Sequence, residues 1–226
     1  MLRRRVMVTG LVLLSLAVLL TAIVAVASTR SVAQRVDDWW YRLMIDIRWT
    51  PFVDISKGLS TLFSTAVDWP VRVVVTLVIA LRRRWLALAA WVVTVAASEL
   101  CIGPIKSLFD RPRPPGSLIA TSGASYPSGH AIASAVTAIG IVMALTTGRR
   151  RLRWMIAAVI IAAAVALSRT YLSAHWLTDV IGGSLIGAGL ALTIPEAFEL
   201  GRDRLSHSSV HGQQASTPPE TPGRDP

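Results

Sequence analysis

Apolar residues follow one another along this chain in long runs that are interrupted by short arginine-rich or loop-like segments. The first run, residues 6–27, is long enough to cross the roughly 30 Å hydrocarbon core of a bilayer as one helix. Five further apolar runs follow it, at 58–81, 85–105, 128–147, 154–168 and 176–197. The pattern predicts an all-α, polytopic membrane protein with about six transmembrane helices.

The composition supports a membrane protein and excludes an ordinary soluble domain. Of the 226 residues, 53% are hydrophobic and only 16% are charged. The net charge of +10 would suggest nucleic-acid binding in a soluble protein. Here the arginines cluster at the ends of apolar runs, which fits membrane topology better, so no nucleic-acid partner is expected. A single cysteine, Cys101, excludes an intrachain disulfide, and nothing in the sequence specifies an oligomeric state.

The chain divides into four segments. Residues 1–27 are interpreted as a first transmembrane helix that is retained, although Ala25-Val26-Ala27 resembles a signal-peptidase site. Residues 28–57 are mixed and rich in tryptophan, which predicts an extracytoplasmic loop with an interfacial segment. Residues 58–200 form the predicted core. Residues 201–226, rich in Ser, Gln, Pro and Gly, are predicted to be a disordered cytoplasmic tail.

Arginine density predicts the orientation in the membrane. Six spans place both chain ends on one side, together with three tight arginine groups, Arg3–Arg5, Arg82–Arg84 and Arg149–Arg153. The basic residues of the other side are nearly as many, but they are spread over longer loops and mixed with acids. Because the positive-inside rule acts most strongly on short connections, both termini are predicted to be cytoplasmic, in a cell (plasma) membrane. The loop 106–127 and the turn 169–175 then lie outside.

Three polar stretches meet on that outer face: KSLFDRPRP (106–114), YPSGH (126–130) and SRTYLSAHWLTD (168–179). They bring three cations, Lys106, Arg113 and Arg169. The planar guanidinium suits phosphate oxygens and lysine supplies a point charge, so the three predict a site for one anion.

The same stretches carry groups able to act on such an anion. Ser128 is placed to cap the helix that follows, and Gly129 lets the backbone N–H groups at its start approach an anion. His175 and Asp179 are four residues apart at the start of a helix, so carboxylate and imidazole share a face. Asp179 could then hold one ring N–H and leave the other nitrogen as nucleophile or base. His130 would be the second titrating group, placed to protonate a leaving oxygen.

Each feature taken alone also has a structural explanation. Pro-Ser-Gly before a helix is a common cap, a His–Asp pair at this spacing can be a structural hydrogen bond, and boundary arginines such as Arg111 are usually anchors. Asp68 and Arg72 are interpreted as a structural pair, and Glu99 as an intramembrane acid without an obvious partner. We prefer a functional site to these structural explanations, because the structural explanations would have to hold for all three stretches at once, and all three lie on the predicted outer face.

The three stretches together resemble the type 2 phosphatidic acid phosphatase superfamily, whose integral-membrane members dephosphorylate lipids. The signature of that family begins with Lys, six residues and Arg-Pro, which match Lys106 through Pro114. Pro-Ser-Gly-His follows at Pro127–His130, and Ser-Arg, five residues, His, three residues and Asp match Ser168 through Asp179. No motif position is substituted. The resemblance implies a haloperoxidase-like helical core.

The resemblance also implies roles for these residues. His175 would form a phosphohistidine, Asp179 would orient it, and His130 would protonate the leaving group. The phosphoryl oxygens would be bound by a set that adds Ser128 and the Gly129 backbone to the cations, namely Lys106, Arg113, Ser128, Gly129 and Arg169. No metal and no cofactor are implied, and three cations lie where a metal would otherwise stand.

The expected function is that of a metal-independent membrane lipid phosphatase or diphosphatase. Undecaprenyl diphosphate is the leading candidate substrate, and phosphatidic acid and phosphatidylglycerol phosphate remain open. The alternative is a non-enzymatic lipid or anion transporter on the same membrane fold, which would need the cations but not His175 and Asp179 beside His130.

Overall fold

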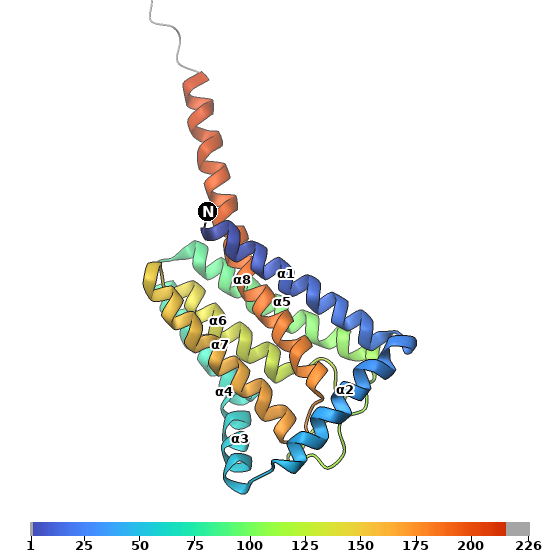
Figure 1. The fold of residues 1–226 in the computed structure, drawn as a ribbon. Coiled ribbons are helices and arrows are strands. Elements are labelled where there is room, and N and C mark those ends of the chain that lie inside the picture. The colour runs from blue at the N-terminus through green and yellow to red at the C-terminus, as the bar shows by residue number, and fades with distance from the viewer. Residues whose placement is uncertain (1, 216–226) are drawn as a thin grey trace, which may run out of the picture.

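The computed structural model describes residues 2–215, with the backbone alone at residues 2, 27–30 and 207–215. Within this part of the chain the regular secondary structure is entirely α-helical (Figure 1). The helices are α1 (Leu2–Ala25), α2 (Ala27–Asp46), α3 (Thr50–Leu62), α4 (Thr65–Leu81), α5 (Trp85–Phe109), α6 (Gly129–Leu145), α7 (Gly148–Tyr171) and α8 (Leu177–Ala215). The predicted all-α fold class is confirmed.

Several of these helices are long and apolar enough to cross a membrane. In the described residues four qualify individually, namely α1, α5, α7 and the part of α8 up to Ser206. The helices α3 and α4 qualify as one span with a bend of 49° between them, and α6 is a shorter apolar helix of 17 residues. The protein is therefore a multi-pass membrane protein, and the count of six spans stays a prediction.

Helix α6 lies at the centre of the bundle. It packs against α8 and α7, and also against α5 and α4. Ile132, Val136 and Ile139 on α6 are each at most 3% exposed. A helix that is apolar all round is stable when protein surrounds it, and this central helix carries Gly129 and His130 at its first two positions.

Small residues on α8 allow it to lie close against the start of α6. A β-carbon added to Gly183 would come within 2.6 Å of the Ser128 carbonyl oxygen, and one added to Gly187 would come within 2.6 Å of the Ile132 carbonyl oxygen. Close helix approach through small residues is typical of membrane bundles. The two glycines therefore bring the first turn of α6 next to the His175–Asp179 segment.

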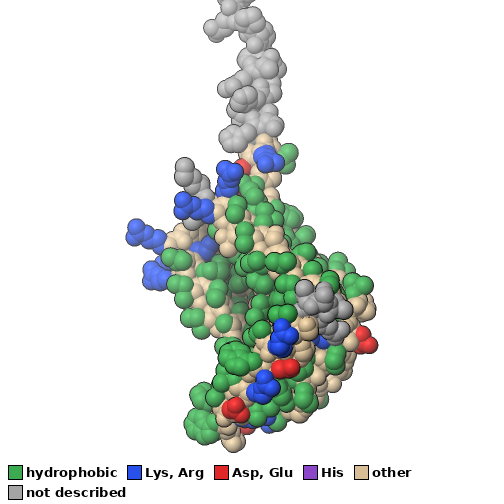
Figure 2. Space-filling model, turned by 45° about the vertical axis from the view of Figure 1, so that its right-hand side comes forward, with side chains coloured by type: hydrophobic (Ala, Val, Ile, Leu, Met, Phe, Trp, Pro, Cys, Tyr) green, Lys and Arg blue, Asp and Glu red, His purple; other side chains and the backbone are tan. Residues whose placement is uncertain are grey.

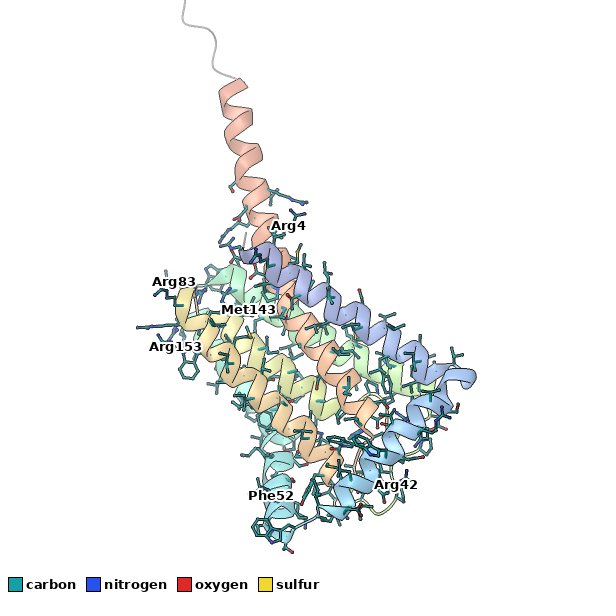
Figure 3. All side chains as sticks on the ribbon, viewed as in Figure 1. Arg4, Arg42, Phe52, Arg83, Met143 and Arg153 are labelled. Carbon is teal, nitrogen blue, oxygen red and sulfur yellow. The ribbon has the colours of Figure 1, made fainter. Side chains whose placement is uncertain are left out.

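The two ends of the bundle differ in charge. The N-terminus and the far end of α8 lie at the same end (Figure 1). Arg4, Arg83 and Arg153 lie at that end, whereas Arg42 and Phe52 lie at the opposite end (Figure 3). The space-filling view shows basic side chains gathered at the first end and hydrophobic ones over the body (Figure 2). The three arginine groups thus share one end, and the side of the membrane that it faces stays a prediction.

Two segments differ from the sequence prediction in their secondary structure. Residues 28–57, expected to be a loop with an interfacial segment, form α2 and the start of α3, because α2 buries one face through Ala33, Asp37 and Met44. Helix α8 continues to Ala215 although disorder was expected from residue 201. The expected tail over 216–226 lies outside the described residues.

Candidate active site

A cavity of about 380 Å³ opens at the end of the bundle opposite the arginine groups. Its wall includes six of the eight residues that the sequence singled out, namely Lys106, Arg113, Gly129, His130, Arg169 and His175. The other two lie directly behind this wall: Asp179 is fully buried behind His175, and Ser128 is fully buried beside Gly129. The structure therefore brings the three sequence stretches together in one place.

Different helix ends supply these side chains. Lys106 lies in the last turn of α5, which extends to Phe109 and so takes in a residue that the sequence placed in a loop. Arg169 lies in the last turn of α7, and Asp179 in the first turn of α8. The short connection between α7 and α8 carries His175. Helix ends bring both unpaired backbone groups and flexible connections to the cavity.

The two ring nitrogens of His175 have distinct environments. Nδ1 lies 2.8 Å from the carbonyl oxygen of Ser125, so it carries the proton and donates it there. Nε2 lies 3.1 Å from Nη1 of Arg113 and accepts a hydrogen bond from it. The lone pair of Nε2 is therefore directed to the cavity side of the ring, where Arg113 also lies.

Asp179 supports His175 less directly than its spacing suggested. Its Oδ2 lies 3.5 Å from Nδ1 of His175, farther than the Ser125 carbonyl oxygen. The same carboxylate oxygen accepts hydrogen bonds from the Ser125 hydroxyl and, at 2.8 Å, from the backbone N–H of Trp176. Asp179 thus joins the segment before α6 to the segment that carries His175, and its negative charge lies beside the imidazole.

Arg111, interpreted from sequence as a membrane anchor, lies instead in the interior. Its guanidinium donates to Oδ1 of Asp179 at 2.7 Å and to Oδ2 of Asp37 on α2 at 2.6 Å. Arg111 is 2% exposed, and both carboxylates are fully buried. Thr178 donates its backbone N–H and its hydroxyl to Asp37. No sequence motif marked Asp37, since only the fold brings α2 to the start of α8.

Arg113 is held by the loop before α6. It donates to the carbonyl oxygens of Gly123 at 3.0 Å and Ser122 at 2.8 Å, and to that of Ala174 at 2.8 Å. Because one guanidinium binds both loops, it is already oriented when a ligand arrives, and its Nη1 lies next to His175 Nε2.

Among the buried polar atoms that have no hydrogen-bond partner in the described residues, two belong to residues that the sequence analysis assigned to the site, namely Ser128 Oγ and Arg169 Nε. Arg169 donates from Nη1 to the hydroxyl of Ser60 on α3, a residue that the sequence analysis did not identify. Buried polar groups are normally paired, so such orphans point to a missing partner. A phosphoryl group bound between α6 and α7 would supply acceptor oxygens for both.

A second charged cluster lies on another side of the cavity. Arg72 binds Oδ2 of Asp68 at 2.6 Å, and its Nη1 donates to Oε1 of Glu99 at 2.7 Å. The Asp68–Arg72 pair expected from the sequence is therefore present, and it supplies the partner that Glu99 lacked. Asp68 and Glu99 both line the cavity.

The electrostatics of the site follow from burial and from neighbouring charge. Burial lowers the pKa of His175 to about 4, against the raising effect of Asp179, so the imidazole is neutral at pH 7. Burial also lowers the pKa of Arg113, and Asp179 opposes that shift. Within the described residues no group of three or more His, Cys, Asp or Glu side chains is placed to hold a metal ion. Metal independence stays a prediction.

Comparison with known proteins agrees with this geometry. The chain is 41% identical over 68 residues to an undecaprenyl-diphosphatase of Sulfolobus acidocaldarius, a match that covers 30% of each protein. Two crystal structures share the fold. A transmembrane PAP2-type phosphatidylglycerolphosphate phosphatase from Bacillus subtilis aligns with a TM-score of 0.74 and 23% identity over 85% of this chain and 96% of that one. Aquifex aeolicus LpxE aligns with a TM-score of 0.57 and 20% identity, over 68% and 91% of the two chains.

The sequence model of the PAP2 superfamily matches residues 87–200, half of the chain. The matched region begins near the start of α5 and ends in α8, so it contains all three stretches that line the cavity. The fold class is the one expected from the motif resemblance, and the roles of the cavity residues stay predictions. The chain therefore belongs to the PAP2 superfamily.

Proposed function

We propose that this protein is a membrane lipid phosphatase that works through a phosphohistidine on His175. The observation that carries the proposal is the convergence of two histidines and three cations on one cavity. The cations supply favourable contacts for the three equatorial oxygens of a transferring phosphoryl group. The undecaprenyl-diphosphatase named above supports a phosphatase reaction.

The proposed reaction has two steps. Nε2 of neutral His175 attacks phosphorus, the bond from phosphorus to the leaving oxygen breaks, and the electron pair of that bond passes to the leaving oxygen. His130 enters this step protonated, donates its proton to the leaving oxygen and becomes neutral. Water then attacks the phosphorus of the phosphohistidine, and neutral His130 accepts a proton from the water. The bond from phosphorus to Nε2 breaks with its electron pair passing to the ring, so that inorganic phosphate leaves and neutral His175 is restored. Asp179 stabilises the positive ring during the intermediate.

An apolar groove beside the cavity supports a lipid as substrate. The groove has a volume of about 480 Å³, lies between α4 and α5, and shares Trp69 and Glu99 with the cavity wall. A lipid with its phosphate at His175 could therefore place its chain between these helices. Undecaprenyl diphosphate is the leading candidate, and phosphatidic acid and phosphatidylglycerol phosphate are the alternatives. The arginine density further supports an extracytoplasmic cavity in a plasma membrane, with cytoplasmic termini.

Phosphate release from a panel of lipid monophosphates and diphosphates tests the function. We expect His175→Ala to lose at least about a thousandfold in turnover, because nucleophile removal eliminates the covalent route. We expect activity to persist in EDTA. A labelled phosphate on the wild-type protein after rapid quenching, absent from the variant, would identify the intermediate.

A matched lysine pair provides the control. Lys106→Ala should weaken turnover strongly, whereas Lys57→Ala, at an exposed position on α3, should leave it unchanged. Both variants should unfold at the wild-type temperature. Full turnover in His175→Ala would refute the nucleophile assignment. Absence of phosphate release by the wild type on every substrate would favour the transporter alternative.

A further inference from the structure

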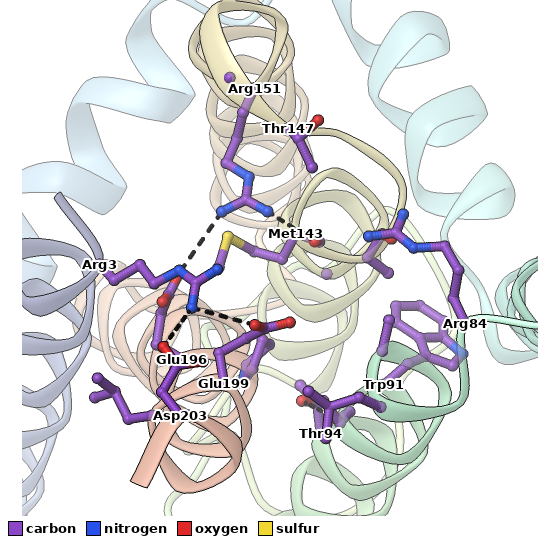
Figure 4. Close-up of a pocket in the computed structure, with 18 of the residues that line it drawn as sticks. Arg3, Arg84, Trp91, Thr94, Met143, Thr147, Arg151, Glu196, Glu199 and Asp203 are labelled. Atoms are coloured by element: carbon purple, nitrogen blue, oxygen red, sulfur yellow. Dashed lines mark hydrogen bonds and ion pairs between the residues drawn. The ribbon is translucent and has the colours of Figure 1, made fainter. Parts of the chain in front are cut away.

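A second cavity, larger than the first, lies at the arginine end of the bundle (Figure 4). Its volume is about 610 Å³, and most of the residues that line it belong to α1, α5, α6, α7 and α8. Its lining combines charged groups with apolar side chains, among them Trp91 and Met143. None of its residues belongs to the phosphatase cavity described above.

One wall of this cavity carries an unsatisfied acid. Glu196 on α8 is 2% exposed, and its Oε2 has no hydrogen-bond partner among the described residues. Its other oxygen, Oε1, lies 3.5 Å from Nη1 of Arg151, a distance too long for a good hydrogen bond. An acceptor buried without a donor is costly. Since Glu196 lines the cavity, the missing donor would come from a molecule bound inside it.

Basic groups also line this cavity. Arg84 lies across the cavity from Glu196, as Figure 4 shows, and its Nη1 donates to the carbonyl oxygen of Ala144 at 2.6 Å. Arg3 contacts Glu199 at 3.3 Å and Asp203 at 2.9 Å. Arg3 therefore lies beside the acids, as Arg151 does, and the guanidinium of Arg84 lies across from them. An unpaired carboxylate oxygen on one side and a guanidinium on the other suit a ligand that carries both charges.

An apolar groove adjoins the charged cavity. It has a volume of about 410 Å³ and is lined largely by apolar side chains of α1, α6, α7 and α8, including Leu13, Leu152 and Val159. The groove and the cavity share five residues, namely Arg3, Met143, Gly148, Arg151 and Glu196. The charged cavity thus continues into an apolar groove along the membrane-spanning helices. Together they would fit an amphiphile with a charged head group and an apolar chain.

We propose that this site binds a phospholipid whose head group ends in a primary ammonium, separately from the substrate. The ammonium donates to Glu196 Oε2, the phosphate lies toward Arg84, and an acyl chain lies in the groove. A purely anionic head group would leave Glu196 unpaired next to another negative charge. A trimethylammonium head group has the charge but no N–H donor for the carboxylate.

Titration of the purified full chain in detergent, followed by native mass spectrometry, tests this binding. The probes are dioleoyl phosphatidylethanolamine, dioleoyl phosphatidylcholine and dioleoyl phosphatidylmethanol, whose anionic head group carries no hydrogen-bond donor. We expect the wild type to bind the ethanolamine lipid about tenfold more tightly than the other two, as the loss of one charge-assisted hydrogen bond predicts.

Two variants assign the two halves of the head group. Glu196→Gln should lower binding of the ethanolamine lipid to the level of the choline lipid, whereas Arg84→Ala should weaken all three lipids. Asp54→Asn, at an exposed position on α3, is the control and should bind as the wild type does. Retained phosphate release, or for an inactive preparation an unchanged unfolding temperature, shows that each variant is folded.

Two results would overturn the proposal. One is equal affinity of the wild type for all three lipids, and the other is an ethanolamine preference that survives Glu196→Gln. Loss of the ethanolamine preference in Lys106→Ala, which changes the phosphatase cavity and not this one, would place the lipid in the phosphatase cavity and equally overturn the proposal. Because binding is the readout, the result does not depend on whether the protein is a phosphatase.

Discussion

Two buried arginine clusters border the phosphatase cavity, and they differ in how far their carboxylates are exposed. Arg111 lies between Asp37 and Asp179, and both carboxylates are fully buried and take further hydrogen bonds. Arg72 lies between Asp68 and Glu99, but the side chain of Glu99 is 40% exposed. The carboxylates of the Arg111 cluster are thus shielded from solvent. In the Arg72 cluster, Glu99 lines both the cavity and the apolar groove between α4 and α5.

The difference indicates different tasks. Buried charges hold their geometry well when each has partners, and they are costly when one partner is lost. The Arg111 cluster therefore suits a fixed support behind His175. A half-exposed acid such as Glu99 can exchange partners with water or substrate, so the Arg72 cluster suits contact with a bound head group. Substitutions in the two clusters should have unequal effects.

The largest effect is expected from Arg111→Ala. This change leaves Asp37 and Asp179 buried without their cation, so the free energy of unfolding should fall by about 3–5 kcal/mol. Phosphate release should fall with it, because Asp179 would no longer be held beside His175. Denaturant titration of the purified protein measures the first effect. Arg42→Ala, an exposed arginine at the same end, is the matched control. Equal stability of the two variants would remove the distinction between the clusters.

A pH titration tests the environment of His175. Its folded pKa of about 4 lies below the ordinary value of 6.5, so the unfolded chain binds the proton first as pH falls. The stability present above pH 6.5 should therefore be lost as pH falls toward 4, on the order of 3 kcal/mol for this group. His175→Gln should lack this part of the loss. An identical pH profile in wild type and variant would show that the ring is not held neutral by burial.

The smallest effect on stability is expected from Glu99→Gln. Arg72 keeps Asp68 at 2.6 Å, and a half-exposed ion pair contributes little, so the free energy of unfolding should change by less than about 1 kcal/mol. The lost negative charge should instead lower KM for a lipid diphosphate roughly fivefold relative to a monophosphate. Steady-state kinetics on both substrates measure this ratio. A large loss of stability without a change in the ratio would make the second cluster structural as well.

Much of the architecture could be predicted from the sequence. Apolar runs predicted the long helices, since a spanning helix must be apolar over its whole length. The three sequence stretches predicted a common site, and the cavity wall confirms that Lys106, His130 and His175 lie together. Helix ends were less predictable: the apolar run of α5 was taken to end at residue 105, yet the helix continues to Phe109 and carries Lys106 with it.

The contacts that support the site could not be predicted from the sequence. Asp37 and Arg111 are 74 residues apart, and neither lies in a periodic pattern that marks the other as its partner. Arg111 stands at a helix boundary, where a membrane anchor and a buried ion pair have the same sequence appearance. Glu99 had no obvious partner in the sequence because Arg72, which donates to it, belongs to another helix.

The chain's own pattern of apolar runs, arginine groups and spaced motifs is enough to predict a helical membrane protein and six residues that line one cavity. The reason is that these signals are local: hydrophobic length, helix caps and i, i+4 spacing act within a few turns of chain. The packing of α2, α6 and α8 determined the rest, including the link from Asp37 through Arg111 to Asp179 beside His175. It also places Glu196, together with Glu199 and Asp203, at the second cavity. Such pairings depend on distances between helices, and no local spacing encodes them.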